Sequence, residues 1–198
     1  KTGVEQLLEG GRMLERMLDM DMGEVRIGAS DMTLQFFLLP FLEQFHKEYP
    51  RIKVTVTNAP TPETICSLEE GKIDFGVVTT PFSCKSTIHS MMVKPIGTVF
   101  IAGDSFGELK GKKLDYSILG SLPCIFLEKN TSTRAFMDAF LSAKGMELTP
   151  EFELATSDMI VQFAKRNMGV GCVMDGFAKD AIAKGEVFEL DFKEKMPL

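Results

Sequence analysis

The stretch EVRIGASDMTLQFFLLPFLEQFHKEYPRIKVTVT, residues 24–57, places a strand, a polar turn, a helix and a second strand in direct succession. Residues 24–28 are predicted to form a short strand, and residues 33–48 carry apolar side chains at helical spacing. Residues 52–57 then alternate between apolar and polar side chains, as a half-buried strand does. Because a helical crossover joins the two strands, we expect them to lie parallel in one sheet.

The same order of strands and helices continues along the rest of the chain. It predicts strands at 73–78, 122–127, 152–154, 169–174 and 187–192 and helices at 63–70, 133–143, 158–166 and 177–183. An apolar stretch at residues 93–102 separates two such units and could pass between them, and residues 187–192 could pass back. Strands that alternate with helices predict the α/β class with a mostly parallel sheet.

The composition predicts a soluble, acidic protein. The 198 residues suffice for one large domain or two small lobes, and their formal net charge is -6. No run approaches the ~18 consecutive apolar residues that a membrane span needs. A surface that binds duplex DNA shows a clustered basic footprint, and the sequence contains none. This chain is therefore a poor candidate for binding DNA itself.

The N-terminal segment has the pattern of an amphipathic helix. Residues 3–20 place apolar side chains at helical spacing, interrupted by Gly10 and Gly11. An isolated helix of this length is marginal in water, so we expect it to pack against another subunit or its own domain. The chain begins with Lys1 and shows no basic-then-apolar secretory pattern, and we expect that an upstream segment has been removed.

The cysteines favour reduced thiols that lie in or near the core of a cytosolic protein. The sequence has four, far apart and without a C-x-x-C pair: Cys66, Cys84, Cys124 and Cys172. Cys124 and Cys172 lie in apolar runs, where a thiol behaves as a small hydrophobic group. A redox-sensing pair is the alternative, but it needs an exposed thiol of lowered pKa beside a partner, and no local pattern indicates one.

Polar turns precede the predicted helices, at the carboxyl ends of predicted strands. They are rich in hydroxyl side chains and lie at residues 30–33, 58–61, 79–80 and 130–134. Free N–H groups at helix starts favour carboxylate, sulfate or phosphate, and ligands of parallel α/β sheets collect at this edge. Ordinary helix capping alone explains any one of these turns and is the more common role, and the two roles can occur together. Arg134 could bind an oxyanion, although a surface arginine is more common, and Asp31 argues against a purely anionic ligand.

The sequence shows no sign of catalysis or of metal binding. It lacks a G-x-S-x-G elbow, a P-loop, a dinucleotide fingerprint and a neighbouring Ser/His or Cys/His pair. The GVG at 169–171 begins a predicted strand, so it does not form a phosphate loop. His46 and His89 are widely separated and offer no zinc-ligand spacing. We therefore predict no catalytic residue, no metal and no cofactor.

Several of these segments together resemble the regulatory domain of LysR-type transcriptional regulators. In the first half they are GEVRIG (23–28), LLPFLEQFHKEYPRIKVTV (38–56) and LEEGKIDFGVV (68–78). In the second half they are FMDAFLSAKGMELTPEFE (136–153), IVQFAKRNMGVGCVM (160–174) and VFELDF (187–192). The resemblance covers nearly the whole chain from Gly23 onward.

The resemblance implies a periplasmic-binding-protein-like fold of type 2, with two α/β lobes joined by two crossover strands. Residues 1–22 would end the linker helix, residues 23–98 and 189–198 would form lobe I, and residues 99–188 would form lobe II. A small anionic or zwitterionic effector would bind in the cleft between the lobes. Carried over position by position, the effector contacts are Ser30, Asp31, Thr33, Thr61, Thr79, Thr131 and Thr133.

The resemblance also implies partners. Members of the family bind DNA through an N-terminal winged helix-turn-helix, which this sequence does not contain. Their sensing domains pair as dimers, and the full-length proteins are often tetramers. These regulators act in the cytoplasm and do not bind a membrane. A transporter's solute-binding protein with the same two-lobed fold is the alternative function, and an enzyme on that fold is a third.

Three features depart from the family pattern. Met174-Asp175 stands where many members have a proline, so the wall of the cleft could differ there. Residues 128–134 contain no cysteine, which argues against the peroxide-sensing branch. The sequence stops at Leu198, before the last strand and helix usual in the family: either the chain is truncated or its end is not represented in this sequence, and the first lobe could lack part of its cover.

Overall fold

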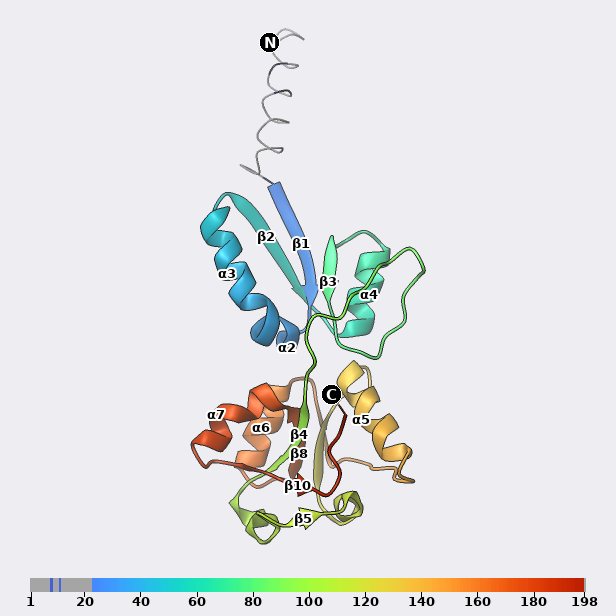
Figure 1. Ribbon diagram of the computed structural model, residues 1–198, viewed down its shortest axis with the longest axis vertical. Coiled ribbons are helices and arrows are strands. Elements are labelled where there is room, and N and C mark those ends of the chain that lie inside the picture. Colours follow the sequence, from blue (N-terminus) through green and yellow to red (C-terminus); the bar gives the residue numbers. More distant parts are fainter. Residues whose placement is uncertain (1–7, 9–10, 12–22, 198) are drawn as a thin grey trace. The chain divides into compact units, whose positions relative to one another are not determined.

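The computed structural model describes residues 8, 11 and 23–197 (Figure 1). The helix predicted at residues 3–20 and the linker assigned to residues 1–22 lie outside the described residues, apart from positions 8 and 11. The chain divides into two compact units, Lys1–Thr79 and Thr80–Leu198, each with its own sheet and core.

The first unit is built on three parallel strands in the order β2-β1-β3. They are β1 (Gly23–Ala29), β2 (Ile52–Asn58) and β3 (Phe75–Val77). All three predicted strands and their parallel arrangement are confirmed. Side chains alternate between the two faces of a strand, so one face of β1 presents Ile27 and Ala29 and the other presents Gly28.

Helices cover both faces of this sheet (Figure 1). Ile27 and Ala29 pack against the helix that leads into α3 (Leu39–Glu48). On the opposite face lies α4 (Thr61–Glu69), and a Cβ atom at Gly28 would approach the Thr64 methyl carbon to 2.7 Å. Glycine at position 28 therefore allows α4 to pack close to the central strand.

The helix predicted at residues 33–48 is confirmed, with a local irregularity. Three consecutive segments form it: α2 (Asp31–Thr33), a π-helical turn η1 (Leu34–Leu38) and α3. The Leu39 N–H donates to the carbonyl of Leu34, five residues back. Pro40 has no N–H, and its ring crowds the carbonyl four residues earlier, which explains the widened turn.

The second unit contains a five-stranded mixed sheet in the order β7-β6-β8-β4-β9. The strands are β4 (Thr98–Ala102), β6 (Cys124–Leu127), β7 (Phe152–Leu154), β8 (Val170–Met174) and β9 (Phe188–Glu189). β6 runs parallel to β7 and β8, whereas β4 is antiparallel to β8 and β9. The expectation of a mostly parallel sheet is therefore wrong for β4. No crossover helix precedes β4, and the strand lies between β8 and β9, which α7 connects.

Three helices cover the faces of this sheet (Figure 1). They are α5 (Ser132–Ser142), α6 (Ser157–Lys165) and α7 (Asp175–Ala183). Met137 and Leu141 of α5 pack with Phe126 in the core of one face. On the other face, a Cβ atom at Gly171 would approach Ile160 of α6 to 2.5 Å. Side chains that alternate along β6 and β8 thus face the helices on the two opposite sides of the sheet.

Residues 103–121, for which the sequence pattern predicts no element, contribute two short helices and a strand. These are the 3₁₀-helices η2 (Asp104–Leu109) and η3 (Tyr116–Ser121) and the strand β5 (Lys113–Leu114). β5 pairs in parallel with β10 (Asp191–Phe192). The rings of Tyr116 and Phe192 stack with centroids 4.1 Å apart, which joins this segment to the end of the chain.

The final strand predicted at residues 187–192 forms as β9 and β10, whose sheet partners are β4 and β5. The structure thus places both strands in the second unit, whereas the sequence assigned residues 189–198 to lobe I. Backbone pairing with β4 and β5 and the stacking of Phe192 are the physical reason. The predicted lobe boundaries as a whole stay a prediction. Among the described helices, none is long and apolar enough to cross a membrane.

All four cysteines are free, and two of them lie in the core. Cys124 on β6 and Cys172 on β8 are buried, as expected for thiols in apolar runs. Burial raises the pKa of the Cys124 thiol to about 12 and also raises the pKa of Cys172. Cys66 on α4 is exposed and Cys84 is half-buried, so the expectation of core or near-core thiols is wrong for Cys66.

Alkylation with iodoacetamide is expected to separate these thiols. Because the thiolate is the nucleophile, Cys66 should react in the folded protein while Cys124 and Cys172 stay unmodified until the chain unfolds. Peptide mass spectrometry before and after addition of urea measures the modified fraction at each position. Rapid modification of Cys124 in the folded protein would contradict the burial described above.

Candidate functional site

The carboxyl ends of β1, β2 and β3 meet at one edge of the first unit's sheet. In the register of the sheet, Ala29 lies between Asn58 and Val77, the last residues of the neighbouring strands. The Ala59 N–H donates to the Ala29 carbonyl at 3.2 Å, which extends the pairing past the end of β2. The turns that follow these strands therefore start from one edge of the sheet, as in parallel α/β sheets that bind ligands.

Ser30 caps the helix that follows β1. Its hydroxyl oxygen accepts a hydrogen bond from the Thr33 N–H at 3.3 Å and lies 3.2 Å from the Thr33 hydroxyl. Asp31 occupies the first turn, where a carboxylate is favoured by the helix dipole, and it is half-buried. The capping explanation is thus confirmed for Ser30, and it leaves a role in ligand binding open.

Buried threonine hydroxyls join the end of β3 to both helices of the first unit. The Thr33 Oγ1 lies 2.9 Å from the carbonyl oxygen of Val77 and donates to it. The Thr79 N–H donates to the Thr61 Oγ1 at 3.3 Å, and the two hydroxyl oxygens lie 3.4 Å apart. Thr33, Thr61 and Thr79 are all buried. The structure therefore brings together Ser30 with Thr33, and Thr61 with Thr79, around the end of β3.

Thr61 was expected in the turn before the helix, but it lies inside the helix α4. It is the first residue of α4, and Pro60 precedes it in the capping position, so Thr61 does not cap the helix. Thr64, one turn later, is almost fully buried and donates from its hydroxyl to the Ala59 carbonyl at 3.2 Å. The sequence pattern does not indicate this role of Thr64, because a threonine inside a predicted helix carries no local signal of such a contact.

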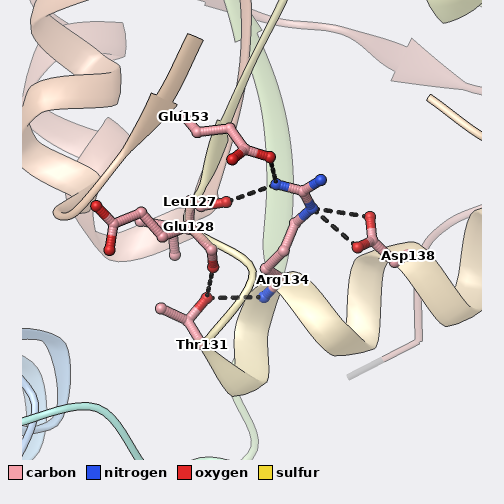
Figure 2. A network of polar contacts seen from close by, with 6 residues as sticks. All are labelled: Leu127, Glu128, Thr131, Arg134, Asp138 and Glu153. Carbon is pink, nitrogen blue, oxygen red and sulfur yellow. Dashed lines mark hydrogen bonds and ion pairs between the residues drawn. The ribbon is translucent and has the colours of Figure 1, made fainter. Parts of the chain in front are cut away.

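In the second unit, Thr131 caps α5 at the carboxyl end of β6 (Figure 2). Its hydroxyl oxygen accepts from the Arg134 N–H at 3.2 Å and donates to the Glu128 carbonyl at 3.0 Å. Thr133 lies in the first turn of α5 and is half-buried. The predicted site residues therefore fall into two sets, one for each unit, and their contact with a ligand stays a prediction.

Arg134 is buried, so the expectation of a surface arginine is wrong, and protein acceptors already engage its guanidinium. Only 2% of its side chain is exposed, and its guanidinium donates to three acceptors (Figure 2). Nε contacts both carboxylate oxygens of Asp138 at 2.9 Å, and one terminal nitrogen contacts the Leu127 carbonyl at 2.8 Å and the Glu153 carboxylate at 2.9 Å. Burial lowers the pKa of Arg134, but the bonds to the two carboxylates outweigh it and raise the pKa above its usual value.

The GKID segment at residues 71–74 has a structural role that the sequence did not indicate. The Asp74 carboxylate accepts from the Arg26 backbone N–H at 2.7 Å and from the Arg26 guanidinium at 2.8 Å. The same guanidinium donates to the Gly71 carbonyl at 3.1 Å. Hydrogen bonds from the Arg26 side chain and N–H hold the pKa of Asp74 below its usual value. This motif fixes the loop before β3 to β1.

The described residues include no group of three or more His, Cys, Asp or Glu side chains that could hold a metal ion. What the geometry offers is a set of hydroxyl and N–H groups at helix starts. Such groups bind polar oxygens of a small ligand without changing its covalent structure.

Comparison with known proteins gives a consistent result. The family model "LysR substrate binding domain" matches residues 19–198. The chain is 21% identical over 184 residues to the regulator YeiE of Escherichia coli K12, covering 93% of this chain and 62% of YeiE. It is 24% identical over 151 residues to the regulator CysL of Bacillus subtilis, covering 75% of this chain and 49% of CysL. The chain thus spans less than two thirds of the length of either regulator.

Solved structures of similar proteins show the fold. HinK of Pseudomonas aeruginosa, a LysR family regulator, superposes with a TM-score of 0.74 at 15% identity, covering 98% of this chain and 67% of HinK. The effector binding domain of QuiR, in complex with shikimate, gives 0.73 at 13% identity, covering 87% of this chain and 82% of that domain. The regulatory domain of Synechocystis CcmR, in complex with 2-PG, gives 0.73 at 20% identity, with coverages of 88% and 83%. The predicted periplasmic-binding-protein-like fold of type 2 is confirmed.

Proposed function

The chain belongs to the LysR family through its substrate binding domain, and on that premise we propose that it is the effector-sensing part of a transcriptional regulator. It binds a small metabolite and transmits its presence to a winged helix-turn-helix outside residues 1–198. The regulator acts in the cytoplasm as a dimer or tetramer. The relatives named above are regulators and not enzymes, in agreement with the predicted absence of catalysis. None of them supports the alternative of a transporter's solute-binding protein.

One observation carries the proposal: three parallel strands end at one edge of the sheet, where hydroxyl-bearing helix starts follow β1 and β2. N–H groups at these starts favour a carboxylate or phosphate oxygen. Asp31 in the same turn favours a donor group, such as an ammonium or a hydroxyl. A zwitterion or a hydroxylated acid meets both requirements. Shikimate, bound by the similar domain of QuiR, is a hydroxylated acid of this class.

In the proposed mechanism the ligand binds at the turns that carry the predicted site residues, which are Ser30, Asp31, Thr33, Thr61, Thr79, Thr131 and Thr133. A ligand changes the equilibrium between two arrangements only by its difference in affinity for them. A difference of about 5.5 kcal/mol reverses a 1:99 population, so a few hydrogen bonds made in one arrangement suffice.

A thermal-shift screen of organic acids, amino acids and inorganic anions tests the proposed site. A ligand at about 100 times its Kd should stabilise the wild-type chain by about 2.7 kcal/mol. Thr33→Ala and Thr131→Ala should each reduce this ligand-induced stabilisation by about 1 kcal/mol, because each removes a hydroxyl beside the ligand. The ligand-induced shift, and not the melting temperature itself, is compared, since Thr33→Ala also removes the bond to Val77.

The matched control for this screen is Thr55→Ala on β2. The Thr55 side chain is half-buried, and its hydroxyl donates to Glu24 in an exposed hydrogen bond, away from the carboxyl ends of the strands. Its ligand-induced shift should equal that of the wild type. Equal shifts in all four proteins would remove the support for the site, and the same promoter footprint of the full-length regulator with and without the ligand would contradict the sensing function.

A further inference from the structure

The charges around Arg134 argue against a direct contact between this side chain and an anionic ligand. Its guanidinium faces the carboxylates of Asp138 and Glu153, so the three side chains together have a net charge of about −1. Nε and one terminal nitrogen both donate within the protein (Figure 2). A cation surrounded in this way attracts an anionic ligand weakly, because the two carboxylates already compensate its charge. The side chain must have another role.

The contacts of Arg134 close the turn between β6 and α5 at both ends. At the start of the turn, the guanidinium donates to the carbonyl of Leu127, the last residue of β6. At its end, the Arg134 N–H donates to the Thr131 hydroxyl, which itself donates to the Glu128 carbonyl. The ion pair with Glu153 holds the same side chain to the neighbouring strand β7. One residue thus links β6, β7 and the first turn of α5.

The guanidinium of Arg134 lies over the aromatic ring of Phe126. The guanidinium carbon lies 5.4 Å from the centroid of the ring, and Phe126 is fully buried in the core. Arginine suits this place better than lysine, since its planar fork donates in several fixed directions and stacks on aromatic faces. A lysine ammonium could keep the charge but not the three directions.

We propose that Arg134 is a positioning residue: it holds residues 128–133 in the conformation in which Thr131 and Thr133 meet the ligand, and it does not bind the ligand itself. The part of this inference that concerns the ligand rests on the proposed function. The part that concerns the conformation of residues 128–133 rests only on the contacts of Arg134. The two parts can therefore fail separately.

Amide hydrogen exchange of Arg134→Lys, without ligand, tests the conformational part. The amides at positions 128, 131 and 134 donate hydrogen bonds in and beside this turn, and they should exchange about ten-fold faster than in the wild type, since the bond to the Leu127 carbonyl is lost. Amides of β8 serve as the internal reference for global opening. The control is Leu141→Ala, which weakens the same core from the far part of α5 and should leave the ratio of turn to β8 exchange unchanged.

A titration with shikimate as the probe, at a temperature where all variants are folded, tests whether the conformation held by Arg134 matters for ligand binding. Arg134→Lys should bind about ten-fold more weakly, whereas Leu141→Ala should bind like the wild type. If Arg134→Lys does not fold, Asp138→Asn replaces it, because this change keeps the cation and its bond to Leu127 but removes one ion pair. Its amides in the turn should exchange faster than those of the wild type, and unchanged exchange would count against the positioning role.

The outcomes separate the two ideas. Unchanged exchange at positions 128, 131 and 134 in Arg134→Lys, or equal acceleration in Leu141→Ala, overturns the positioning role. Faster exchange with unaltered shikimate affinity also overturns it, because the turn's conformation would then not matter to the ligand. Binding of neither shikimate nor any screened compound by the wild type contradicts the proposed function, while the exchange data still decide how Arg134 acts on the turn.

Discussion

Arg134→Met should lower the free energy of unfolding by about 3 kcal/mol, as measured by urea unfolding followed by circular dichroism. Methionine fills a similar volume, so the loss reports mainly on polar contacts. The change leaves the Leu127 carbonyl without its donor and two carboxylates without their cation. Asp138 and Glu153 are 46% and 40% exposed, so water hydrates them partly and keeps the loss near the lower end of the range for buried pairs.

A triple variant provides the control for this experiment. Arg134→Met combined with Asp138→Asn and Glu153→Gln removes the uncompensated charges along with the cation. If charge imbalance dominates, the triple variant should recover more than half of the stability lost in Arg134→Met. A single variant within about 0.5 kcal/mol of the wild type would show that the cluster acts as an ordinary surface ion pair.

Gly169→Ala should destabilise the second unit by about 3 kcal/mol. Gly169 has φ +156°, a conformation that side chains disfavour, and a Cβ atom there would approach the Pro123 carbonyl oxygen to 2.6 Å. That oxygen cannot easily move away, because it accepts the Val170 N–H at 2.8 Å. The glycine is therefore required by the close approach of two backbones. Thermal unfolding of the purified variant measures the effect.

Gly120→Ala is the matched control for this change. A Cβ atom at Gly120 would meet nothing within 4 Å, and its φ is not positive. The control should stay within about 0.5 kcal/mol of the wild type. A stable Gly169→Ala variant would mean that the segment before β8 can move away from Pro123, which would contradict the packing described above.

Side-chain periodicity predicts most of the fold, because regular elements bury one face or stripe. The helix at residues 33–48 and the strands at 52–57 and 152–154 are confirmed within two residues. Periodicity fails at residues 103–121, where 3₁₀-turns bury side chains without a regular spacing. It also cannot give strand direction: residues 93–102 were expected only to pass between two units, and part of this stretch forms β4, which is antiparallel to β8 in a sheet predicted to be mostly parallel.

The candidate site is predictable only in part. Capping chemistry is local, so Ser30 and Thr131 are found from the sequence as helix-start residues. The contacts of Thr33 with Val77 and of Arg134 with Glu153 join positions far apart in the chain. Only the fold brings these pairs together. For this reason the sequence could not show that Arg134 is buried and already paired.

The position of β4 inside its sheet has a consequence for the order of folding during synthesis. β4 takes partners from β8 and β9, and Phe100 at its centre packs edge-on against Phe192, so its neighbours emerge from the ribosome long after it does. The three strands of the first unit are complete by Val77. At about 5–20 residues per second, this unit can fold several seconds before the second sheet has all its strands. The nascent chain therefore carries β4 for that time with both apolar faces uncovered, a period in which a chaperone would be most useful.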